Sequence, residues 1–303
     1  MMQNPLAVFI ASVCAFLGLQ AASFVLGLNE VSTFLGVSFA VYLFLVIWQA
    51  FIFDLHLKTS SIRTIERTLL GGLKNRWAYL WNIHHFLHFQ NYLILPGIIY
   101  WMTVILIYLN PFDELVKQVW IVASSIALAA AQWYLKTVFL AHKESGAPAR
   151  QIIFTAKLYA SYIAFAAAFG ISRYFGPLPA DQKPDDYFTL GAPGFAVIAF
   201  CATVLLLYQA LFQHHFVGFK ILKYLFAAGT GLAVLGFALF YYWNVNYYSG
   251  ALVMAGVYNT VWGIIHHKYI DKNLTRTIVY EYLAVLFVIL VMVFSTTNFA
   301  ERI

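Results

Sequence analysis

Apolar stretches long enough to cross a bilayer follow one another along nearly the whole chain. A helix needs about 20 mostly apolar residues to span the hydrocarbon core. Nine stretches qualify: 5–28, 33–53, 78–108, 116–141, 152–175, 191–213, 219–243, 250–268 and 278–296. The sequence therefore predicts an all-α, polytopic transmembrane helical bundle of about nine spanning helices, with residues 1–303 forming a single transmembrane domain.

The composition supports a membrane class. Only 10% of the residues are charged and 62% are hydrophobic, whereas a soluble domain carries about 25% charged residues. The formal net charge of +6 comes from basic residues in short loops, which indicates membrane topology rather than nucleic-acid binding. Cys14 and Cys201 both lie inside apolar stretches, so neither a disulfide nor a thiolate metal site is expected. The opening MMQNPLAV has no basic leader, which favours a retained first helix over a signal peptide.

The basic residues alternate along the loops. The segments 54–77, 142–151, 214–223 and 268–277 carry lysines and arginines, whereas the loops between them are acidic or neutral. Loops rich in lysine and arginine stay in the cytoplasm. We therefore expect an integral protein of the bacterial inner (plasma) membrane, with its N-terminus in the cytoplasm and its C-terminus outside.

All nine histidines fall at the predicted cytoplasmic side. They are His56, His84, His85, His88, His142, His214, His215, His266 and His267. Neutral imidazole is the commonest protein metal ligand, and its burial near lipid costs less than that of a carboxylate. This one-sided distribution predicts a metal centre, although His56 and His142 also fit ordinary interfacial residues.

Helical spacing narrows the set of ligands. His84 and His88 are four residues apart and share one helix face, and so would His267 and Asp271 if their helix continued that far. An acidic residue just inside the ninth helix is costly unless it is paired or coordinated. The candidate metal ligands are His84, His85, His88, His214, His215, His266, His267 and Glu281, and the candidates for orienting them are Asn82, Gln90, Asn91, Asp271 and Tyr280.

Three histidine segments carry a resemblance to known families. HHFLH, QHH and IIHH occupy positions similar to the histidine boxes of membrane non-haem iron oxygenases such as fatty-acid desaturases and hydroxylases. IHHFLHFQNY, FQHHFVGF and WGIIHHKYID also resemble, in order, the histidine helices of Brp/Blh-type β-carotene 15,15'-dioxygenases, over about thirty residues. The resemblance implies histidine-bound iron, with His84, His88, His215 and His267 as its foremost ligands.

The predicted function is a membrane metal-dependent oxidoreductase or dioxygenase of lipid metabolism. It would hold one or two non-haem irons and use dioxygen on a lipid, isoprenoid or carotenoid substrate taken from the bilayer, with a cytosolic or membrane electron donor. A haem electron carrier is one alternative, because two axial histidines such as His85 and His214 would suffice. A proton or metal-ion transporter is another, although such proteins place ionisable residues near the bilayer midplane.

Overall fold

The computed structural model of the chain is helical throughout the part that it describes. It describes residues 5–28, 30–52, 74, 77–78, 81–109, 114–140, 147–175, 190–213, 219–242 and 247–296. The helices there are α1 (Pro5–Gly27), α2 (Val31–Ile52), α4 (Ile83–Leu109), α5 (Glu114–Leu140), α6 (Ala147–Tyr174), α7 (Gly191–Gln213), α8 (Phe219–Tyr242), α9 (Tyr247–Ile265), the π-helix η3 (His266–Ile270) and α10 (Arg276–Thr296). No strand occurs among these residues, so the predicted all-α fold is confirmed.

Every long helix except α9 is apolar enough to cross a membrane. Eight helices of the described part meet this condition by length and hydropathy, which indicates an integral membrane protein. The second half of α9 carries Tyr258, Asn259, Thr260 and Trp262, which lower its apolar character. Several of these side chains are buried, among them Tyr258 and Trp262. Packing inside protein therefore accounts for a helix less apolar than its neighbours.

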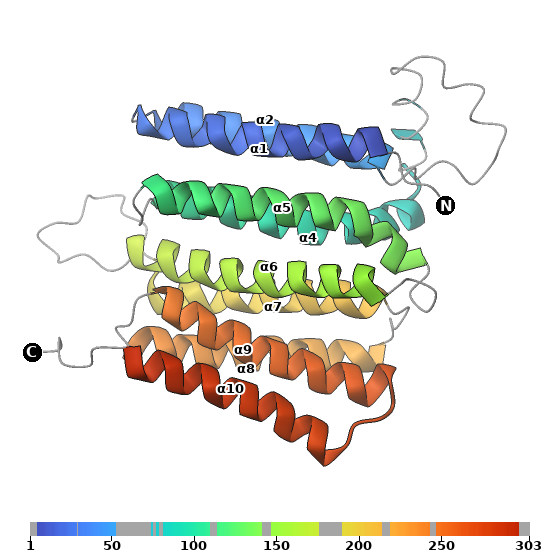
Figure 1. The fold of residues 1–303 in the computed structure, drawn as a ribbon, viewed down its shortest axis with the longest axis vertical. Coiled ribbons are helices and arrows are strands. Elements are labelled where there is room, and N and C mark those ends of the chain that lie inside the picture. Colours follow the sequence, from blue (N-terminus) through green and yellow to red (C-terminus); the bar gives the residue numbers. More distant parts are fainter. Residues whose placement is uncertain are drawn as a thin grey trace, which may run out of the picture. The chain divides into compact units, whose positions relative to one another are not determined.

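The chain divides into two compact units, Met1–Ala156 and Lys157–Ile303. Helices that follow one another within each unit run in opposite directions (Figure 1). The helix α6 begins in the first unit, and its larger part belongs to the second. This division does not test the prediction of a single transmembrane domain.

Small residues let the helices of the first unit approach closely. Buried Ala7, Ala11, Ala15, Gly18 and Ala22 form a stripe along α1 at spacings of three and four residues. A Cβ on Gly18 would lie 2.5 Å from a methyl carbon of Val41, so only glycine fits against α2 at this point.

Hydrogen bonds fix the register of α4 against its two neighbours. The Tyr100 hydroxyl donates to the Ser38 carbonyl of α2 over 2.8 Å. The Thr103 and Ser124 hydroxyls lie 2.7 Å apart and link α4 to α5. Inside a bilayer, where no water competes, such bonds specify which turns of two helices meet.

In the second unit an aromatic cluster joins α6, α7 and α8. The Phe169 ring lies 4.0 Å from that of Phe195 and 6.2 Å from that of Phe240, measured between ring centroids. The helix α9 approaches the same cluster, because a Cβ on Gly250 would lie 3.1 Å from the Phe169 ring. The helix α10 packs on α9, and Val293 is its one buried residue.

Candidate functional site: a histidine–carboxylate cluster after α9

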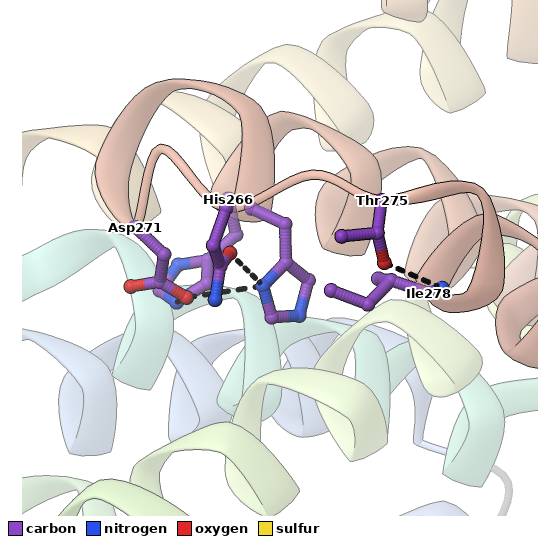
Figure 2. A network of polar contacts seen from close by, with 6 residues as sticks. His266, Asp271, Thr275 and Ile278 are labelled. Atoms are coloured by element: carbon purple, nitrogen blue, oxygen red, sulfur yellow. Dashed lines mark hydrogen bonds and ion pairs between the residues drawn. The ribbon is translucent and has the colours of Figure 1, made fainter.

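The end of α9 widens into a π-helix, and this change brings two histidines to one carboxylate. The Asp271 amide donates to the His266 carbonyl, five residues earlier, over 3.2 Å. In an α-helix a residue five positions on lies about 140° away around the axis, so His266 and Asp271 would point apart. The wider π turn instead brings His266 beside Asp271 (Figure 2), and His267 approaches the same carboxylate.

Both imidazoles approach the same oxygen atom. His266 Nε2 lies 3.2 Å from Asp271 Oδ2, and His267 Nδ1 lies 3.1 Å from it. His267 Nδ1 also lies 3.0 Å from Asn273 Oδ1. Because carboxylate and amide oxygens accept hydrogen bonds, these contacts place the ring protons on His266 Nε2 and His267 Nδ1. In the neutral rings the lone pairs are then on His266 Nδ1 and His267 Nε2.

The turn that follows η3 holds Asp271 in place. Lys272 has a φ of 53°, in the left-handed region, and reverses the chain. The Thr275 hydroxyl then accepts a hydrogen bond from the Ile278 amide over 3.4 Å and caps the first turn of α10 (Figure 2). The site therefore lies between two fixed helix ends.

An aromatic ring lies beside each of the two histidines. The His266 ring lies 5.4 Å from that of Trp262, and the His267 ring lies 6.0 Å from that of Tyr282 on α10. Close approach of the two helices brings Tyr282 to this position, since a Cβ on Gly263 would lie 2.1 Å from Tyr282 Cζ.

Partial burial favours the neutral form of His266. It lowers the pKa of His266 below its ordinary value of 6.5. Asp271 acts in the opposite direction, whereas the positive charges of His267 and Lys157 add to the lowering. Lys157 is only 7% exposed, on α6, and lies within electrostatic reach of the cluster. A neutral imidazole is the form that binds metal.

The structure describes the remaining candidate ligands in less detail. The backbones of His84, His85 and His88 form the first two turns of α4, and their side chains lie outside the description. His56, His142, His214 and His215 lie outside the described residues. Glu281 is exposed on α10, and the carboxylate that meets the imidazoles is that of Asp271.

The predicted orienting residues differ in burial. Asp271 contacts both imidazoles. Asn91 is fully buried in α4, Gln90 is partly exposed, and Asn82 is exposed just before that helix. Tyr280 is 66% exposed.

The cluster is not a complete metal site by itself. Within the described ranges, no group of three or more histidine, cysteine, aspartate or glutamate side chains is arranged so that it could hold a metal ion. The donor chemistry of two imidazoles backed by a carboxylate fits a divalent transition metal, but further ligands are required.

Two residues beside His267, Asn273 and Tyr282, were not predicted from the sequence. Asn273 reaches His267 only because the chain turns at Lys272, and Tyr282 reaches it only through the packing of α10 on α9. Lys157 did carry a signal, since it is a lysine within a long apolar helix. A charge in such a position is costly unless it has a role.

Comparison with protein-family models, curated proteins and solved structures finds no match to this chain.

Proposed function

We propose that this membrane protein binds a transition metal through its clustered histidines and uses it as an oxidoreductase on a lipid or isoprenoid substrate. The contact of His266 and His267 with one oxygen of Asp271 is the observation that carries the proposal. A carboxylate that accepts the proton of an imidazole fixes the tautomer and makes the other ring nitrogen a better ligand.

His267 is the first ligand of the proposed centre. Its Nδ1 faces Asp271 and Asn273, so its Nε2 carries the lone pair that a metal would bind. His214 and His215, from the same unit, are the proposed partners because they follow the last residue of α7. His84, His85 and His88 stay candidate ligands in the other unit, and Glu281 stays a candidate carboxylate ligand.

Non-haem iron is the proposed metal, because imidazole and carboxylate donors suit iron. Bound iron would supply the activation of dioxygen. The substrate is proposed to be hydrophobic and to enter from the bilayer, with reducing equivalents from a cytosolic or membrane donor.

Elemental analysis of detergent-purified protein tests the proposal, with an optical spectrum recorded beside it. We expect iron in the wild-type protein, and a loss of about half or more of it under limiting metal in His267→Ala. His142→Ala is the control, because His142 stands alone rather than in a histidine pair. Full metal retention in His267→Ala would exclude this ligand, and a Soret band would identify haem instead.

We also propose the bacterial inner membrane as the location, with the N-terminus in the cytoplasm and the C-terminus outside. The alternation of basic and acidic loops supports this orientation. Fusions at the C-terminus test it: alkaline phosphatase is expected to be active there, and green fluorescent protein dark. The reverse pattern would invert the topology.

A further inference from the structure

Three carboxamide side chains are buried in the apolar interior of the first unit. Gln49 on α2 is 2% exposed, and Asn91 on α4 and Gln132 on α5 are both 0% exposed. All buried polar side chains that the structure describes in this unit are uncharged. Buried amides in membrane helices are costly unless their donors and acceptors are satisfied.

The register of the helices brings the three amides to a similar level. The Thr103–Ser124 contact between the antiparallel helices α4 and α5 places Gln132 level with Leu95. Leu95 lies four residues, about 6 Å, beyond Asn91. The Tyr42 hydroxyl lies 3.0 Å from the Cβ position of Gly97, so Gln49 on α2 lies within about one turn of the level of Gln90. The three amides therefore fall within about two to three helical turns of one another along the bundle.

Two of these amides have hydrogen-bonding atoms that nothing in the described part of the first unit satisfies. Among the residues that the structure describes, neither Nε2 nor Oε1 of Gln132 has a hydrogen-bond partner, and neither does Oε1 of Gln49. Gln20 in the same unit behaves differently, since its amide donates to the amide oxygen of Gln118. Gln132 thus offers both a donor and an acceptor at a position closed to solvent.

We propose that this amide cluster, Gln49, Asn91 and Gln132, binds the uncharged oxygen-bearing end of a lipid, a hydroxyl or carbonyl group, inside the first unit. Such a group accepts from the Gln132 Nε2 amide, and a hydroxyl also donates to a glutamine Oε1. A carboxylate or phosphate is disfavoured, because no buried cation of the described part of this unit would neutralise it. The proposal does not depend on a metal.

Photo-crosslinking of the full-length protein in membranes tests it. The probe is a long-chain fatty alcohol with a diazirine beside the hydroxyl and an alkyne at the far end, and the matching fatty acid is the comparison. We expect the alcohol, and not the acid, to label peptides of α2, α4 and α5 around the three amides. Gln132→Leu should lower this labelling about five-fold, the effect of losing roughly one net hydrogen bond.

The matched control is Gln20→Leu, which removes a glutamine that already has a partner and should leave the labelling unchanged. Gln49→Leu is the second variant, because it leaves Gln132 in place and is expected to reduce labelling less. Equal labelling in the wild type and Gln132→Leu, or labelling spread evenly over the lipid-facing helices, would overturn the proposal. So would a wild type that takes up no alcohol while Gln132→Leu gains thermal stability, since the amides would then bind water alone.

Discussion

His267 Nδ1 lies 3.1 Å from Asp271 Oδ2, and the same oxygen lies 3.2 Å from His266 Nε2. One carboxylate therefore orients two neighbouring imidazoles through a single atom. The π turn is what permits this sharing, because an α-helical turn would direct His266 away from Asp271. A change at Asp271 must consequently disturb both rings at once.

Asp271→Asn tests that dependence. Asparagine keeps the size of the side chain, but it removes the negative charge that stabilises the two ring N–H groups. We expect the affinity for metal to fall about ten-fold or more, as it does when residues that orient a ligand are replaced. Competition with a chromogenic chelator measures the affinity. Glu30→Gln removes one exposed negative charge before α2 and is the control. Equal losses in both variants would mean that overall charge, rather than the Asp271 contact, is responsible.

The fold was largely predictable because apolar length alone locates a membrane helix. The stretch 191–213 coincides with α7, and 219–243 extends one residue beyond α8. The first residue of a helix was harder to predict where polar residues precede the helix. For example, α4 begins at Ile83 rather than at 78. The pairing of His267 with Asp271 followed from a four-residue spacing, whereas the added contact of His266 required a π turn that spacing does not reveal.

The contact between α9 and α10 depends on Gly263. A Cβ there would lie 2.1 Å from Tyr282 Cζ, so Gly263→Ala must push the helices apart or rotate the tyrosine. We expect a loss of about 1–3 kcal/mol of stability, the usual effect of overpacking, measured by unfolding in detergent. Gly231→Ala on α8 is the matched control, because nothing lies within 4 Å of its Cβ position. Alanine there should be neutral or stabilising. An unchanged stability for Gly263→Ala would contradict the close packing of these helices.

Lys272 has a backbone conformation that suits glycine better than lysine. Its φ of 53° lies in the left-handed region, which costs a residue with a Cβ about 1–2 kcal/mol. Lys272→Gly is therefore expected to raise the melting temperature of the protein in detergent. Lys272→Ala removes the same charge but keeps the Cβ, and should produce no rise. If both variants raise the melting temperature equally, the lysine charge rather than its backbone is the source of the cost.

The stability of the metal-free protein should depend on pH through His266. Burial lowers the pKa of His266 below 6.5, and Asp271, His267 and Lys157 are the charged groups that act on it. The unfolded chain therefore takes up a proton at a higher pH than the folded protein does. The free energy of unfolding therefore decreases as the pH falls below about 6.5. The decrease ends once the pH is below the lowered pKa of His266 in the folded state.

Denaturation in the presence of a chelator, followed between pH 8 and pH 5, measures this effect. This pH range includes the ordinary histidine pKa of about 6.5. His266→Phe keeps an aromatic ring against Trp262 and removes the titrating group. We expect its stability to decline less with falling pH than that of the wild type. Identical slopes would place the pH dependence on other groups. A wild type that becomes more stable as the pH falls would show that the Asp271 carboxylate outweighs burial and raises the pKa of His266 instead.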